Sequence, residues 1–340
     1  MTIVRIATVE MASSRAAPTC TIGASMASPP LYVVGAGALG LHLAARLSTV
    51  TPVTIVARGP RAVRLAREGF DLAGSEQGHF QLPVVDFAQP LPASAELLLA
   101  VKATQLRETL HHLRPGPQHA LGLCQTGLGI AAMARALAPS AARVRLGCWL
   151  AVGLASPTVV RVGGVYQVEL AADDPEALRT RDRWQRLLGA AGYPVRTVSS
   201  VAACEWRKAL INLAVSGLCA SLGERTGAIV DSAPLNALAR EILQEARSVA
   251  AAEGVRLGDD DLERVFTSAA NLRDSRNTML QDVTRGESTE MQFLNLAVAR
   301  LAVKHGLFAP VNAVVARLVE HVERRRPAGT PETAGTAGTT

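Results

Sequence analysis

The first half of the chain alternates short apolar stretches with longer amphipathic ones. Residues 31–34, 53–57, 96–103 and 121–125 are mostly apolar, and each has the length of a buried strand. The segments between them place apolar residues at helical spacing. Strands that alternate with helices predict a parallel sheet with helices packed on it. We therefore expect a doubly wound, Rossmann-type α/β fold.

The pattern changes in the second half. Residues 148–170 are rich in Gly and Val and β-like, whereas the chain after about Val201 is almost wholly helical. The sequence thus predicts two domains. A Rossmann-type domain spans residues 30–200, and an all-helical domain spans residues 201–325.

Both ends of the chain differ in composition from the rest. Residues 1–29 are rich in Ala, Ser and Thr, and residues 326–340 in Gly, Thr, Pro and Ala, so we expect both to be disordered. A transit peptide is disfavoured because the first segment contains an acidic residue and lacks a basic helical face. The start of translation is left open between Met1 and Met26.

Composition disfavours two classes of protein, nucleic-acid binders and membrane-spanning proteins. Hydrophobic residues make up 49% of the chain and charged residues 19%, which is typical of a globular protein. The net charge of +6 is scattered and aromatic residues are only 4%, which disfavours nucleic-acid binding. Mean hydropathy is positive, yet the longest apolar runs, 146–160 and 209–222, fall short of the ~20 residues of a membrane span. We expect a soluble protein.

Cysteine and histidine usage gives no metal site. The five cysteines, at 20, 124, 148, 204 and 219, contain no Cys-x-x-Cys pair and suit a reducing compartment. The seven histidines lack ligand spacing. The sequence therefore predicts a cytoplasmic protein with buried thiols and no metal ion.

A glycine motif follows the first strand. Gly35, Gly37 and Gly40 lie between a strand and a helix, the context that a dinucleotide site requires. Gly35 permits the tight turn, Gly37 the approach of the pyrophosphate and Gly40 close packing of helix on strand. Ala38 and Leu39 open the helix, whose N-terminus would face the phosphates. A plain turn is the weaker alternative.

The end of the second strand indicates which cofactor binds. NAD sites usually carry Asp or Glu there, but no acidic residue occurs between Leu31 and Arg67. Arg58 ends the strand instead, with Arg61 and Arg64 close behind. A guanidinium suits the 2′-phosphate of NADP, so we predict NADP(H), bound through Arg58. One or two of these arginines are expected to be solvated.

Polar residues also stand where ligands of such folds bind. Lys102 and Thr126 lie near the carboxyl ends of the next two strands. In the helical half, Lys208, Asn212 and Ser216 are spaced i, i+4 and i+8, which predicts one polar stripe on an otherwise apolar helix. Periodicity alone leaves Lys208 open between a snorkelling surface lysine and a functional one.

Several separated motifs then resemble, in the right order, those of the ketopantoate reductases (2-dehydropantoate 2-reductases). They comprise residues 35–40, 101–105, 206–212, 278–282, 285–290 and 306–312. The resemblance runs from Leu31 to about Val322. It implies reduction of the ketone of 2-dehydropantoate by NADPH, on the way to pantothenate and coenzyme A.

The resemblance also implies roles for single residues. Lys208 matches the catalytic lysine, Glu290 the glutamate that engages the substrate hydroxyl and Asn212 a substrate-binding asparagine. Thr278 stands where a hydroxyl residue holds the substrate carboxylate, and Lys102 matches a lysine near the cofactor. Hydride addition makes the ketone oxygen negative, so a nearby ammonium can stabilise it and donate a proton, the more readily if burial lowers its pKa.

Three positions depart from the family pattern. Thr126 and Ser216, which we assign to cofactor and substrate binding, replace asparagines, and Leu296 replaces a glycine. The substrate is therefore open between ketopantoate and another small 2-oxo acid or ketone. A protein that binds NADP(H) without turnover is a third alternative, disfavoured because Lys208, Asn212 and Glu290 occur together. We expect a monomer or homodimer.

Overall fold

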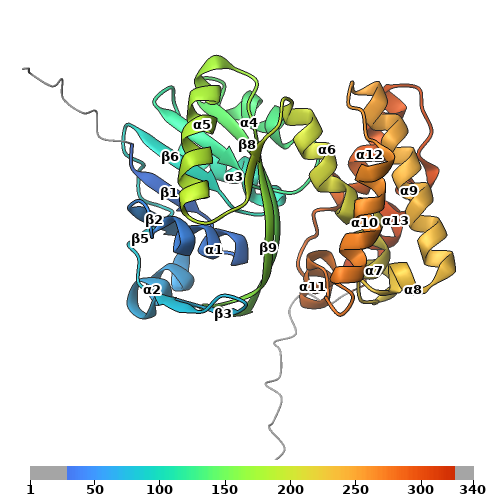
Figure 1. Ribbon diagram of the computed structural model, residues 1–340, viewed down its shortest axis with the longest axis horizontal. Coiled ribbons are helices and arrows are strands. Elements are labelled where there is room, and N and C mark those ends of the chain that lie inside the picture. Colours follow the sequence, from blue (N-terminus) through green and yellow to red (C-terminus); the bar gives the residue numbers. More distant parts are fainter. Residues whose placement is uncertain (1–28, 326–340) are drawn as a thin grey trace, which may run out of the picture.

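The computed structural model describes residues 29–325. The alternative starts at Met1 and Met26 and the segments predicted to be disordered lie outside this range, apart from residue 29. Figure 1 shows the described chain as an α/β part, drawn in blue to green, beside a helical part drawn in yellow to red.

A parallel sheet forms the centre of the α/β part. Its strands lie in the order β5, β2, β1, β6, β7 and β8, all parallel. Their bounds are β1 (Leu31–Val34), β2 (Val53–Ala57), β5 (Val84–Asp86), β6 (Ala95–Leu99), β7 (His119–Leu123) and β8 (Ala142–Ser156). This is the strand order of dinucleotide-binding domains, and it puts the glycine motif at the point where the order reverses.

A long hairpin extends the sheet beyond β8. The next strand, β9 (Val159–Ala171), pairs antiparallel with β8 through three shifts of register. Three short strands then join: β3 (Phe70–Gly74), β4 (Gly78–Phe80) and β10 (Val195–Thr197). The sheet is therefore mixed at this edge rather than wholly parallel. Figure 1 shows β9 as a curved band next to the helical part.

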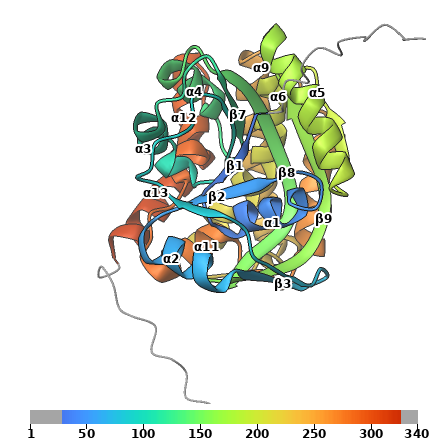
Figure 2. The same cartoon turned by 90° about the vertical axis from the view of Figure 1, so that its left-hand side faces the viewer.

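Helices cover both faces of the sheet, as the doubly wound prediction requires (Figure 2). On one face lie α1 (Ala38–Leu47), α2 (Gly59–Glu68) and α5 (Pro175–Ala190), and on the other α3 (Ala103–Leu113) and α4 (Ile130–Leu137). Leu41 and Trp184 belong to the first core, Leu106 and Ile130 to the second. The predicted fold class is confirmed.

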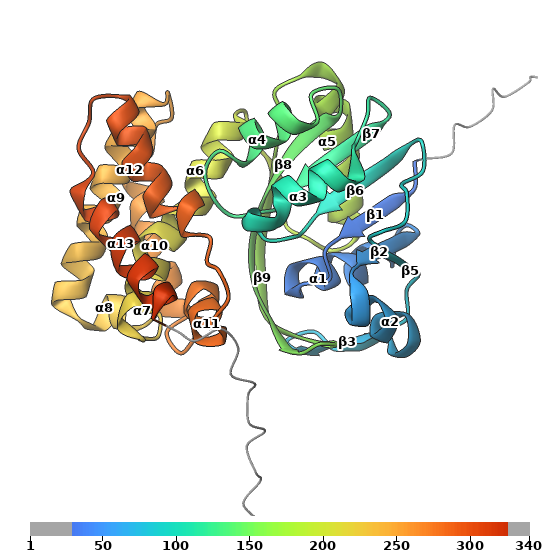
Figure 3. The same cartoon turned by 180° about the vertical axis from the view of Figure 1, so that it is seen from behind.

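The helical part follows in chain order (Figure 3). It comprises α6 (Val201–Ile211), a π-helical turn (Asn212–Ser216), α7 (Gly217–Leu222), α8 (Ala228–Asp231), α9 (Ala233–Ala252), α10 (Asp259–Asn271), α11 (Thr278–Arg285), a 3₁₀ turn (Met291–Phe293), α12 (Asn295–Lys304) and α13 (Pro310–Arg324). Its core includes Leu213, Ile242, Val298 and Val319, all fully buried. Apolar faces at helical spacing account for this bundle.

Two general expectations concern the described residues. The cysteines at 124, 148, 204 and 219 are free and buried, as predicted for small core side chains, and Cys20 lies outside the described range. Within residues 29–325, no helix has the length and apolar character needed to cross a membrane.

Candidate active site

The glycine turn after β1 has one open position. A Cβ on Gly35, at φ 109°, would lie 2.9 Å from the carbonyl carbon of Ala100, and one on Gly40 would lie 1.9 Å from the carbonyl oxygen of Gly35. A Cβ on Gly37 would meet nothing within 4 Å. The turn thus needs two glycines for its own packing, and the third faces free space.

The start of α1 adds donors to this space. No side chain caps the helix, and the first amides of a helix lack intrahelical acceptors. Free amides at the positive end of a helix dipole suit a pyrophosphate. The residues present therefore fit a dinucleotide.

Two arginines lie at the carboxyl end of β2. The guanidinium of Arg58, the N-cap of α2, stacks on the ring of Phe87 with 3.8 Å to its centroid, and Nη1 lies 2.9 Å from Oε1 of Glu108. Arg61 on α2 has Nε and Nη2 buried without a hydrogen-bond partner among the described residues. Burial lowers the pKa of Arg61. An anion at this position would meet one exposed guanidinium and one that lacks a partner.

Lys102 connects the two parts of the molecule. It is the N-cap of α3, and its Nζ donates to Oδ1 of Asp282 at 2.8 Å and to Oε2 of Glu287 at 2.6 Å. Asp282 is buried on α11. Neither carboxylate was predicted as a site residue from the sequence, although Asp282 is the last residue of the family motif at 278–282.

Thr126 lies in the turn after β7. It is partly buried and makes no side-chain hydrogen bond to another described residue. The adjacent Gly127 adopts φ 125°, and a Cβ there would lie 2.6 Å from Cβ of Phe293. The amide of Leu128 donates to the carbonyl of Phe293 at 2.8 Å, so this turn packs against the helical part.

The helix that carries Lys208 is not regular. Ser200 caps its start by accepting from the amide of Ala203 at 3.2 Å. After Ile211 it widens into the π-helical turn and then becomes α7. The expected α-helix is therefore wrong over Asn212–Ser216, although Ser216 Oγ still donates to Asn212 Oδ1 at 3.0 Å. π-helical turns are rare overall, and those that occur are often found at functional sites.

The Lys208 ammonium is partly buried and unpaired. It forms no hydrogen bond or ion pair with any other residue that the structure describes. Its Nζ lies 5.5 Å from the ring centroid of Trp149, over the aromatic face. Burial lowers the pKa of Lys208, and the Arg145 guanidinium lowers it further, while Glu290 acts in the opposite direction. The lysine should lose its proton more readily than an exposed one.

Glu290 lies within electrostatic range of this lysine. Its Oε1 accepts from the amide of Ala103, the first residue of α3, at 2.7 Å. Burial raises the pKa of Glu290, against the lowering effect of Lys102 and Lys208. The structure thus brings Lys102, Lys208 and Glu290, three of the site residues expected from the sequence, into one cluster. The side chain of Thr278, exposed at the start of α11, makes no hydrogen bond to another described residue.

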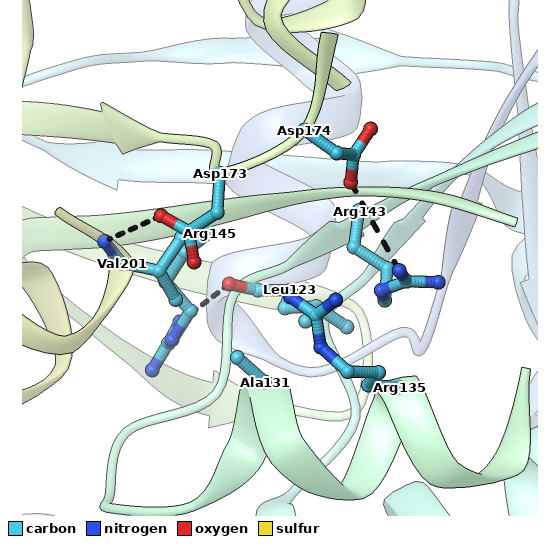
Figure 4. A pocket seen from close by; sticks show the side chains of 8 residues that line it. All are labelled: Leu123, Ala131, Arg135, Arg143, Arg145, Asp173, Asp174 and Val201. Atoms are coloured by element: carbon cyan, nitrogen blue, oxygen red, sulfur yellow. Dashed lines mark hydrogen bonds and ion pairs between the residues drawn. The ribbon is translucent and has the colours of Figure 1, made fainter. Parts of the chain in front are cut away.

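A buried ion pair, not predicted from the sequence, supports this cluster. Arg145 on β8 is fully buried, and its Nε lies 3.2 Å from Oε1 of Glu205 on α6. The guanidinium also donates to the backbone carbonyls of Leu123, Gln125 and Leu146. Figure 4 shows the side chain of Arg145 reaching Leu123 beside two further arginines.

Glu205 extends the link to the turn that holds Thr126. Its carboxylate accepts from the amides of Gly129 at 3.0 Å and Ala131 at 2.8 Å. One ion pair therefore joins the lysine helix to the loop after β7. The only signal of it in the sequence is an arginine at the edge of the apolar run 146–160, which by itself predicts no more than the boundary of that run.

Models of a known family match both parts of the chain. Residues 31–174 match the model described as "Ketopantoate reductase PanE/ApbA", and residues 200–323 match "Ketopantoate reductase PanE/ApbA C terminal". The 2-dehydropantoate 2-reductase of Streptococcus pyogenes serotype M3 is 25% identical over 86% of this chain and 97% of its own. The enzyme of the same name from Pyrococcus horikoshii is 29% identical, over 39% of this chain and 44% of its own length.

Solved structures share the fold. A PanE/ApbA family ketopantoate reductase from Ralstonia eutropha has a TM-score of 0.79 at 23% identity, over 87% of this chain and 99% of its own. D-mandelate dehydrogenase, solved with NADH and anilino(oxo)acetate, also has a TM-score of 0.79. It is 21% identical over 87% of this chain and 98% of its own.

Proposed function

Because the chain belongs to the ketopantoate reductase family of NAD(P)H-dependent oxidoreductases acting on a CH–OH group, we propose that it reduces 2-dehydropantoate to pantoate with NADPH. The proposed reaction is a step of pantothenate and coenzyme A biosynthesis. In this proposal residues 30–200 bind the cofactor and residues 201–325 supply the catalytic and substrate-binding groups.

The observation that carries the proposal is the unpaired ammonium of Lys208. A partly buried cation without a carboxylate partner costs stability. Lys208 has no such partner among residues 29–325, and burial lowers its pKa. Perturbed groups of this kind concentrate at functional sites. This supports a catalytic lysine over a snorkelling one.

The chemistry assigned to Lys208 is proton donation. A bound nicotinamide would supply the hydride to the carbonyl carbon. As that carbon is reduced, its oxygen becomes negative, and the Lys208 ammonium stabilises the charge and donates its proton to form the alcohol. The lysine is left neutral, a state that its lowered pKa favours, and regains a proton from solvent.

The other assigned residues hold the substrate. Glu290 would accept a hydrogen bond from the substrate hydroxyl, and its fixed position on the Ala103 amide supports that role. The hydrogen-bonded pair of Asn212 and Ser216 would bind the substrate beside Lys208, and Thr278 would bind its carboxylate. The last assignment rests on the family motif alone.

The cofactor assignment rests on the α/β part. Gly35, Gly37, Ala38, Leu39 and Gly40 would cradle the pyrophosphate, as the open space before Gly37 supports. We propose that Arg58 binds the 2′-phosphate of NADP. Arg61, whose Nε and Nη2 have no hydrogen-bond partner among residues 29–325, would be a second cation. Lys102 and Thr126 complete the cofactor-facing set, and the ion pairs of Lys102 also join the two parts of the chain.

The test is oxidation of NADPH by the full-length protein in the presence of ketopantoate, with pantoate identified by mass spectrometry. We expect pantoate equimolar with the NADPH consumed. NADPH binding without turnover of any 2-oxo acid would favour the non-catalytic alternative. The fold shared with D-mandelate dehydrogenase, a protein solved with anilino(oxo)acetate, supports the second candidate, reduction of a different 2-oxo acid.

A further inference from the structure

A cavity of about 270 Å³ opens beside Lys208. The β8–β9 hairpin forms one wall, with Trp149 and Leu150, while α6 and α10 form the others, with Ile211 and Val265. Of its lining residues, only Lys208 was predicted from the sequence as a site residue. The cavity therefore places the reactive lysine against a largely apolar space.

Apart from Lys208, the charged side chains that line the cavity take part in ion pairs. Asp261 on α10 lies 2.8 Å from Nη2 of Arg264 and 3.5 Å from Nε of Arg207. The buried carboxylate of Glu169 is bound by an arginine of β10. Lys208 is then the cavity's only cation that lacks a carboxylate partner in the part of the chain that the structure describes. An anionic ligand would be drawn to this lysine.

The volume indicates what else the ligand carries. A cavity of roughly 150 Å³ is enough to bind a benzene ring, and this one is larger by about 120 Å³. The compact branched side chain of ketopantoate would leave part of it empty. The indole of Trp149 and the side chains of Leu150 and Val265 offer the flat and aliphatic surface that an aromatic group prefers.

On the basis of the proposed function, we propose that this cavity receives the side chain of the substrate. The preferred substrate is then a 2-oxo acid with an aromatic or comparably bulky apolar side chain. Its ketone lies at Lys208 and its side chain lies between Trp149 and Val265. Thr126 and Ser216, which stand where the family carries asparagines, agree with a changed substrate.

The first experiment compares kcat/KM for NADPH oxidation with phenylpyruvate, benzoylformate and ketopantoate. We expect at least one aromatic acid to exceed ketopantoate. If ketopantoate has the highest value, the proposed function stands and this inference is overturned. If NADPH binds but no 2-oxo acid is reduced, the proposed function itself fails.

The second experiment fills the cavity. Ser268 on α10 lines it, whereas its neighbour Thr267 is exposed and does not. Ser268→Phe should lower kcat/KM for the aromatic acid by roughly 10- to 200-fold, the range set by steric fit in an apolar pocket, and affect ketopantoate far less. Thr267→Phe, the matched control, should change neither value. Both variants should bind NADPH as the unmodified protein does.

The ratio of kcat/KM between the two substrates decides whether the cavity holds the substrate side chain. Selective loss of the aromatic substrate in Ser268→Phe supports the inference. An equal loss for both substrates, or no loss for either, would overturn it, because the cavity would then not hold the distinguishing side chain.

Discussion

Glu205→Ala is expected to lower the free energy of unfolding by about 3–5 kcal/mol, the cost of removing one partner from a buried ion pair. Glu205 is nearly buried and Arg145 is fully buried. The substitution leaves the Arg145 guanidinium without its counter-charge. It also removes the acceptor of two backbone amides, those of Gly129 and Ala131.

The contacts that remain in Glu205→Ala limit how much unfolding free energy is lost. Each buried donor without an acceptor costs about 1–3 kcal/mol, so the two amides and the arginine could together exceed 5 kcal/mol. Arg145 keeps its three carbonyl acceptors, and the truncated side chain admits water to the amides. The total should therefore stay near that of a single broken pair.

Urea unfolding followed by tryptophan fluorescence measures this loss. The control is Glu320→Ala, which breaks the exposed pair with Arg324 on α13 and should cost about 0.5 kcal/mol or less. Where Glu205→Ala is still folded, kcat/KM should also fall, since the link between the lysine helix and the Thr126 turn is lost. A loss of stability below about 1 kcal/mol would refute the reasoning.

Three further predictions concern the cofactor and substrate. Arg58→Ala should raise the KM for NADPH roughly ten- to a hundred-fold, because a hydrogen bond to a charged group contributes about 1.5–3 kcal/mol. The KM for NADH should barely change. An equal rise in both KM values would contradict the assignment of Arg58 to the 2′-phosphate. Gly37→Ala should weaken NADPH binding without loss of stability. Gly40→Ala should destabilise the fold, because a Cβ on Gly40 clashes and one on Gly37 does not. An equal loss of unfolding free energy in the two variants would contradict this. Thr126→Asn should raise kcat/KM for ketopantoate by up to about tenfold, and Ser216→Asn should add to it; a fall in both variants would mean the pocket serves a different substrate.

The sequence predicts the elements whose signals are local. β1 and β2 have the predicted bounds, Leu31–Val34 and Val53–Ala57, because glycine, proline or charge ends each apolar run. The glycine turn could also be predicted, since strand, turn and helix are adjacent in the chain.

The features that sequence reasoning missed depend on contacts between distant segments. The π-helical turn exposes the carbonyl of Leu213, which accepts from Asn295 Nδ2 on α12 at 3.0 Å, a partner that periodicity cannot reveal. The cavity beside Lys208 exists only because the β8–β9 hairpin and α10 meet there. Arg145 resembles the end of an apolar run because its carboxylate partner is 60 residues away.

The role of Lys208 is most directly tested by comparing Lys208→Ala with the unmodified protein, using the best 2-oxo acid found. We expect kcat to fall roughly 10²–10⁴-fold while the Kd for NADPH is unchanged. In the unmodified protein kcat/KM should decline as pH rises through the lowered pKa of Lys208, because the ammonium is the acid, and this decline should vanish in the variant. A variant that keeps more than about a tenth of the activity, with the same pH profile, would contradict catalysis by this lysine.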